Sequence, residues 1–120
     1  TYGGALYVSA NYSLSAFDCS FSGNQASISG GGIVLAAASI SDWTSCSCTH
    51  NTAHAGSGGC LLSQDESVGE FSSCNFTLNE ASTQGGGACI TGHSEITSAS
   101  SLFSGNESPN GGGVLITSEA

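Results

Sequence analysis

Apolar and polar positions recur along this chain with a period of about 27 residues. Five glycine pairs mark the period, each followed by small or apolar residues, and they begin at Gly3, Gly31, Gly58, Gly86 and Gly112. Between them, the short apolar runs do not keep a 3.6-residue spacing for more than a turn or two, which argues against helices. A fixed period of this size is typical of a solenoid, in which each repeat buries its apolar face against its neighbours.

Each repeat predicts three short strands. First strands are expected after the glycine pairs, at residues 5–8, 33–36, 60–63, 88–91 and 114–117. Second strands are expected around the aliphatic residues Leu14, Ile40, Val68 and Ile96, and third strands through Phe21, Cys48, Phe76 and Phe103. Three short parallel strands per coil predict an all-β, right-handed parallel β-helix of about four coils. The sequence shows no domain boundary within residues 1–120, so we expect one β-helix segment that is part of a longer solenoid or fibre.

A Phe-x-x-Asn motif keeps step with the glycine pairs. Its copies end at Asn24, Asn51, Asn79 and Asn106, with Cys48 in place of Phe in the second copy. Equivalent residues of stacked coils lie roughly 4.8 Å apart, so these asparagines are expected to form a ladder of hydrogen-bonded side-chain amides. The glycine pairs are expected to provide positive φ angles and close backbone approach at another corner.

The two motifs together resemble the repeats of the chlamydial polymorphic outer-membrane proteins. That resemblance extends over nearly the whole chain and is carried by Gly3-Gly4-Ala5-Leu6 and by motifs such as Phe103-Ser104-Gly105-Asn106. It implies a β-helical passenger segment of an autotransported surface adhesin. It also implies an extracellular or cell-surface location.

Composition narrows the possible functions. The chain has no Lys or Arg, 9 acidic residues and a net charge of -9. This charge argues against binding nucleic acid through phosphate neutralisation and against docking on anionic lipid. No apolar run is long enough for a membrane-spanning helix, so membrane insertion is not expected. Phosphate-binding loops and Gly-x-Ser-x-Gly elbows are absent, as is any basic residue for lyase chemistry, so we expect no enzyme.

These observations favour an extracellular structural or adhesive β-solenoid, either a cell-surface adhesin segment or a fibre subunit that stacks end to end. Its expected partners are other copies or neighbouring solenoid segments in axial contact, and glycans or cell-surface receptors on its side faces. The alternative is a carbohydrate-active or carbohydrate-binding β-helix that uses an acidic outer face.

Six cysteines predict an oxidising compartment. Cys19, Cys46 and Cys74 share one column of successive coils, while Cys60 and Cys89 are expected in neighbouring columns. Rungs roughly 5 Å apart satisfy the Cα separation of a disulfide. The favoured pairings are Cys19–Cys46, Cys48–Cys74 and Cys60–Cys89, and the direct stack Cys46–Cys74 competes with them. Reduced cysteines that act as small core hydrophobes are the alternative.

Carboxylates and soft ligands are the remaining candidate chemistry. Asp42 and Glu70 are expected to stack on the outer surface, as are Glu80 and Glu107. Such pairs have the spacing of retaining-glycosidase carboxylates and also suit Ca²⁺, but a solvated acidic face is the favoured interpretation. The cluster Cys46-x-Cys48-x-His50-x-x-x-His54 has zinc-type ligands, yet both cysteines lie in core columns. We therefore expect no cofactor, with Ca²⁺ at Asp42 and Glu70 as the alternative.

Three Asn-x-Ser/Thr sequons begin at Asn11, Asn75 and Asn106. Asn75 lies between two inward residues and is expected to face solvent, and Asn11 is expected in a loop. Asn106 belongs to the amide ladder and is followed closely by Pro109, so it is the poorest site. In a eukaryotic source, glycans are predicted at Asn11 and Asn75.

Overall fold

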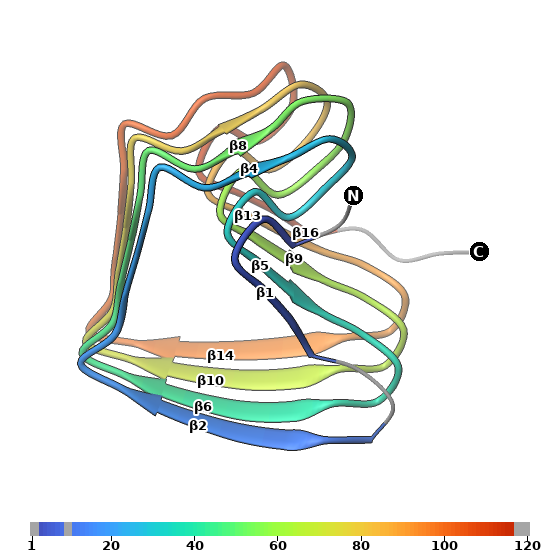
Figure 1. Cartoon of the computed structure of the whole chain (residues 1–120), viewed down its shortest axis with the longest axis vertical. Helices are drawn as coiled ribbons and strands as arrows, with labels where there is room; N and C mark the ends of the chain where they lie inside the picture. The colour runs from blue at the N-terminus through green and yellow to red at the C-terminus, as the bar shows by residue number, and fades with distance from the viewer. Residues whose placement is uncertain (1–2, 9–10, 117–120) are drawn as a thin grey trace.

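The computed structural model describes residues 3–8 and 11–116, which wind into a stack of parallel coils (Figure 1). These residues form strands and turns and no helix, and each strand pairs in parallel with the equivalent strand of the next coil. The predicted all-β parallel β-helix of about four coils is therefore confirmed.

Four sheets form the walls of the described coils. The first sheet holds β1 (Leu6–Val8), β5 (Ile33–Leu35), β9 (Leu61–Ser63), β13 (Ala88–Ile90) and β16 (Val114–Ile116). The second holds β2 (Ser13–Phe17), β6 (Ile40–Thr44), β10 (Val68–Ser72) and β14 (Glu95–Ala99). The third holds β3 (Ser20–Ser22), β7 (Ser47–Thr49), β11 (Asn75–Thr77) and β15 (Leu102–Ser104). The fourth holds β4 (Gln25–Ala26), β8 (Thr52–Ala53) and β12 (Glu80–Ala81), which the sequence does not predict because two-residue strands leave no alternating pattern.

The aliphatic residues of the second sheet do not share one column. Leu14 pairs with Ser41, and Ile96 pairs with Gly69, so these positions share the inward face. Ile40 and Val68 lie one residue earlier, where they are 54% and 38% exposed on the outer surface. The four residues therefore lie in the predicted second strands but on both faces of the sheet, because a shift of one residue moves a strand side chain to the other face.

Large aromatic residues explain why the inward positions are small in the middle coils. Trp43 and Phe71 follow Ser41 and Gly69 by two residues and are almost fully buried. A Cβ atom added at Gly69 would come within 2.7 Å of the Ile96 side chain and 3.1 Å of the Phe71 ring. The core has no room for an aliphatic side chain there.

The interior is organised around a continuous series of aromatic contacts. Phe21 meets Trp43 edge to face at 5.6 Å, and Trp43 stacks on Phe71 at 5.6 Å between ring centroids. Phe71 then meets Phe76 edge to face at 5.3 Å, and Phe76 stacks on Phe103 at 4.6 Å. These are the favourable ring geometries, so the five rings link every coil to the next through the core.

The glycine corner is also displaced from its predicted register. The first sheet aligns Leu6 with Ile33, Leu61, Ala88 and Val114. Three residues before each of these lies a glycine with a φ of 60–71°, namely Gly3, Gly30, Gly58, Gly85 and Gly111. The structural motif therefore begins one residue before the predicted pairs in three coils, although positive φ and close approach are found as expected. A Cβ at Gly59, for example, would come within 2.1 Å of the Gly86 carbonyl oxygen.

A ladder of asparagine amides closes the corner between the third and fourth sheets. The backbone N–H and Nδ2 of Asn24 both donate to Asn51 Oδ1, at 2.9 and 3.0 Å. Asn51 donates in the same way to Asn79, and Asn79 to Asn106. Each inner Nδ2 also reaches a backbone carbonyl of the preceding coil, as from Asn79 to Cys48 at 2.9 Å. Asn51 and Asn79 are completely buried, so the ladder satisfies amides that water cannot reach.

We expect Asn79→Ala to lower the free energy of unfolding by about 3 to 4 kcal/mol, because it leaves buried hydrogen-bonding groups on both neighbouring coils without a partner. Urea unfolding followed by circular dichroism measures this loss. Asn75→Ala is the matched control, because Asn75 is exposed in the adjacent strand β11 and should change the value by no more than about 0.5 kcal/mol. Equal losses in the two variants would show that the ladder is not a special source of stability.

Candidate functional site

The first candidate site is a pair of carboxylates on the outer face of the second sheet. Asp42 in β6 and Glu70 in β10 are direct register partners, flanked by Ser15 and Thr97 in the outer coils. The hydrogen bond that the protonated Glu70 carboxyl donates to the Asp42 carboxylate, together with the negative charge of Asp42, raises the pKa of Glu70. No Lys or Arg exists in the chain to neutralise the pair. The two carboxyl groups therefore interact with each other and with solvent.

The surface around this pair is a shallow hollow on a sheet of five-residue strands. The hollow has a volume of about 480 Å³, and Thr44, Ser72 and Thr97 contribute to its lining. Ile40 and Phe17 are exposed on the same face, at 54% and 70%. We name the outward residues of β2, β6, β10 and β14 the acidic sheet face. It combines carboxylates, hydroxyls and isolated apolar side chains.

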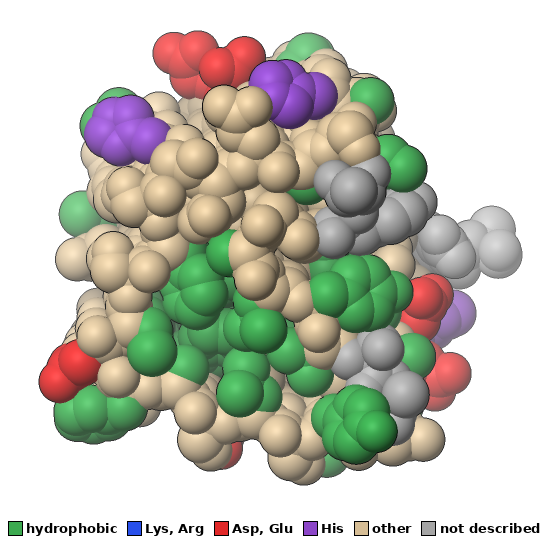
Figure 2. All heavy atoms as spheres, in the orientation of Figure 1, with side chains coloured by type: hydrophobic (Ala, Val, Ile, Leu, Met, Phe, Trp, Pro, Cys, Tyr) green, Lys and Arg blue, Asp and Glu red, His purple; other side chains and the backbone are tan. Residues whose placement is uncertain are grey.

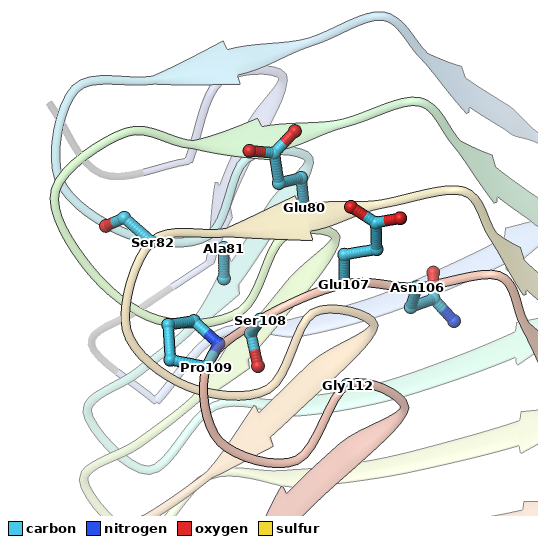
Figure 3. Close-up of a pocket in the computed structure, with 8 residues that line it drawn as sticks. All are labelled: Glu80, Ala81, Ser82, Asn106, Glu107, Ser108, Pro109 and Gly112. Carbon is cyan, nitrogen blue, oxygen red and sulfur yellow. The ribbon is translucent and has the colours of Figure 1, made fainter.

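The second candidate site surrounds Glu80 and Glu107. An isolated parallel bridge places these residues in register, and Figure 3 shows their side chains next to each other, pointing to the same side. They line an open hollow of about 580 Å³ together with Ser82, Ser108 and Pro109. A smaller hollow of about 240 Å³ is lined by the same two carboxylates and by His50. Both predicted acidic pairs are thus stacked on the surface, on different walls of the solenoid.

Metal ligands do not converge at either pair. Across residues 3–8 and 11–116, no group of three or more His, Cys, Asp or Glu side chains is arranged to hold a metal ion. The zinc-type sequence cluster is dispersed, because Cys48 is disulfide-bonded and His54 Nε2 pairs with Gln25 Oε1 at 3.0 Å. Ca²⁺ binding by Asp42 and Glu70 stays a prediction.

The disulfide differs from the predicted pairings. Cys48 bonds to Cys60, with a Cα–Cα distance of 6.0 Å, so the pairings Cys48–Cys74 and Cys60–Cys89 were wrong. Cys60 belongs to the inner core cluster, whereas Cys89 belongs to a cluster on the other side of the first sheet with Val34 and Leu62. A sheet therefore separates Cys60 from Cys89. Cys19, Cys46, Cys74 and Cys89 are free thiols, so the predicted Cys19–Cys46 bond and its competitor Cys46–Cys74 are not formed in this structure.

Two substitutions in one coil explain the disulfide. Cys48 takes the place of Phe, since its register partners are Phe21 and Phe76. Cys60 takes the place of glycine, because it is aligned with Gly32 and Gly87 immediately before the first-sheet strands. The other coils pair a large Phe side chain with a glycine that has no side chain. In this coil two cysteines of intermediate size replace them and meet in the core. The paired replacement is the sequence signal that would have identified this bond.

The sequons that were predicted to carry glycans lie on the surface. Asn75 is exposed in β11, and Asn11 is exposed in a turn with a φ of 64°. Asn106 is engaged in the ladder through Oδ1 and through Nδ2, which donates to the Phe76 carbonyl at 2.8 Å. Glycans at Asn11 and Asn75 stay a prediction.

The glycine corner, the strand pattern and the Asn ladder define a repeat that can be compared with known proteins. Residues 18–36 match the Chlamydia polymorphic membrane protein repeat. The matched segment covers β3, β4 and β5, so it contains one Phe-x-x-Asn motif and one glycine corner of that repeat. The resemblance drawn from the two motifs is confirmed for this segment. Searches of curated proteins and of solved structures give no significant match, and no described helix is long and apolar enough to span a bilayer.

Replacing Cys48 and Cys60 by the Phe and Gly of the neighbouring coils tests whether the disulfide fills the space of a Phe-Gly pair. Removing the cross-link with Cys48→Ser/Cys60→Ser should cost about 3 kcal/mol, as expected for a loop of this length. Cys48→Phe/Cys60→Gly also removes the bond but rebuilds the Phe and Gly of the neighbouring coils, and burying the ring returns about 2 kcal/mol. We expect the second variant to be the more stable by urea unfolding. If it is equally or less stable, Cys48 and Cys60 do not fill the space of a Phe-Gly pair.

The carboxylate pair predicts a defined pH dependence. Because Glu70 has a raised pKa in the folded chain, that chain holds its proton more tightly than the unfolded chain, and stability falls as pH rises through the pKa of Glu70. Glu70→Gln should therefore melt at the wild-type temperature below about pH 4 and at a higher temperature at about pH 7. Glu95→Gln is the control, because it removes the same charge where the register partner is Val68. A similar gain in Glu95→Gln would assign the effect to net charge instead of the pair.

Proposed function

We propose that this chain is a non-catalytic segment of a cell-surface adhesin, built as a rigid β-solenoid that presents its side walls to partners. The observation that carries the proposal is the match of residues 18–36 to the Chlamydia polymorphic membrane protein repeat. That family is not a family of enzymes, and its name links the repeat to membrane proteins. The stacked coils around the matched segment support extending the same role to the rest of the chain.

The ends of the coil stack support its place in a longer solenoid. Figure 2 looks along the stack and shows hydrophobic side chains gathered in the middle of one end. At the other end, an apolar hollow of about 150 Å³ is lined by Ile96, Phe103 and Val114, among others. The rings of Phe21 and Phe103 are only partly buried, unlike that of Phe76 between them. A further coil or a second solenoid segment on each end would cover this apolar surface.

We assign the partner-binding role to the acidic sheet face. Its strands are the longest among residues 3–8 and 11–116, and its side chains project from four adjacent coils at regular spacing. Its carboxylates favour a partner that offers cationic or hydroxyl groups, such as a basic receptor surface or a glycan. A carbohydrate partner would make the chain a lectin-like adhesin without requiring catalysis.

Beads coated with the folded chain should adhere to cultured animal cells, and excess soluble chain should compete with this adhesion. The variant Asp42→Asn/Glu70→Gln should lose most of the adhesion. The matched control Asp65→Asn/Glu66→Gln removes two exposed charges from the turn between β9 and β10 and should keep it. Failure of the wild-type beads to adhere would contradict the adhesive function, and equal adhesion of both variants would move the binding surface away from the acidic sheet face.

The open apolar ends also favour a second function, that of a fibre subunit. Electron microscopy distinguishes this function from that of an adhesin segment. Filaments with a layer spacing of roughly 4.8 Å would identify a subunit that polymerises through its ends. Short discrete rods are the expected result for an adhesin segment.

A further inference from the structure

Three free thiols occupy one column along the corner between the second and third sheets. The Ser47 N–H donates to the Cys19 carbonyl at 2.9 Å, and the Asn75 N–H donates to the Cys46 carbonyl at 3.0 Å. These bonds set Cys19, Cys46 and Cys74 at equivalent places on three successive coils. The column is separate from the Cys48–Cys60 disulfide and from both acidic pairs.

The three thiols also point in the same direction. Each S–H donates to the backbone carbonyl two residues earlier, at 3.5 Å for Cys19, 3.4 Å for Cys46 and 3.4 Å for Cys74. In the fourth coil Ser101 takes this place, and its hydroxyl makes the same contact to the Ala99 carbonyl at 3.2 Å. The corner therefore accepts either a thiol or a hydroxyl in one fixed orientation.

This geometry limits which cysteines can bond. Neighbouring rungs lie roughly 4.8 Å apart, inside the Cα range of disulfides, whereas alternate rungs lie at about twice that distance and outside it. Cys46 can therefore pair with Cys19 or with Cys74, but Cys19 and Cys74 cannot pair with each other. The column can hold one disulfide at a time, and Cys46 must take part in it.

The thiols differ in their access to solvent. Cys19 is partly exposed, whereas Cys46 and Cys74 are buried. Trp43 and Phe71 pack around the buried pair and leave a void of only about 10 Å³. Burial raises the pKa of the Cys46 thiol, which keeps it protonated and slow towards reagents in bulk water. A dissolved oxidant therefore meets Cys19 first.

We propose that the column Cys19–Cys46–Cys74 is a site of thiol–disulfide exchange with small soluble disulfides, in which Cys19 is the entry thiol and Cys46 the resolving thiol. Oxidised glutathione represents this class of reagent. The product is an internal bond that joins adjacent coils, in contrast to a stable adduct on the surface.

Each step is an ordinary exchange reaction. The Cys19 thiolate attacks one sulfur of oxidised glutathione, the S–S bond of the reagent breaks, and one glutathione leaves and takes up a proton. Cys46 then loses its proton and attacks the Cys19 sulfur, and the second glutathione leaves as a thiolate and takes up a proton. Two protein thiols are oxidised to a disulfide while one glutathione disulfide is reduced to two thiols. A subsequent attack by Cys74 on Cys46 moves the bond one rung inward and frees Cys19 without further oxidation.

The test treats the folded chain with oxidised glutathione, quenches with acid, and analyses the products by thiol titration and peptide mass spectrometry. The wild-type chain should lose two of its four free thiols, keep no glutathione, and yield a peptide linking Cys46 to Cys19 or Cys74. Cys46→Ser should lose one thiol and keep one glutathione on Cys19, because the resolving thiol is missing. The serine is tolerated at this corner, as Ser101 shows.

Cys89→Ser is the matched control. It removes a buried thiol from the other side of the first sheet and should react like the wild type. Three results would overturn the proposal: stable glutathione on the wild-type chain, an internal disulfide in Cys46→Ser, or no reaction of either folded chain. The circular dichroism spectra of all three proteins show whether each variant is folded, so a folding defect is distinguished from a change in reactivity.

Discussion

Each coil of this protein lies directly on its neighbours in parallel register, so every interior side chain must pack against the residue that holds the same place one coil away. Residues that interact well with their own kind therefore fill the columns. Phe76 stacks on Phe103, and Asn51 bonds to Asn79 through both its backbone and its side-chain amide. The amide is suited to such a column because it carries both donors and an acceptor, and thus each asparagine satisfies the next.

The same constraint places like charges together on the surface. Asp42 stacks on Glu70 and Glu80 on Glu107, in a chain without a single Lys or Arg. Inside the solenoid such pairs would be prohibitively costly, but water and salt screen them on the outer walls. The interior columns are accordingly neutral, while the acidic residues within the described part of the chain lie on exposed positions. A surface of this kind surrounds the otherwise hydroxyl-rich walls with a negative potential.

The period of the sequence predicts the main architecture, because repetition at this length has few structural solutions. The asparagine corner and the stacked carboxylates also follow from residue spacing alone. Other features depend on information that spacing does not contain. The outward position of Ile40 depends on the size of Trp43, which fills the core beside Ser41. The bond between Cys48 and Cys60 requires knowing that the Phe and Gly columns face each other across the interior. The short strands of the fourth sheet are set by their neighbours, since two residues have little preference of their own.

The asparagine ladder has a direction: the side-chain Oδ1 of each asparagine from Asn51 onward accepts from the asparagine of the coil that precedes it in the sequence. Because every rung is the same, the excision of one complete repeat from an interior position would bring together two coils that already match. Insertion of a repeat would be accommodated in the same way. Genetic recombination between repeats can therefore change the length of such a solenoid without disturbing its cross-section, which makes length a property that can evolve by repeat number.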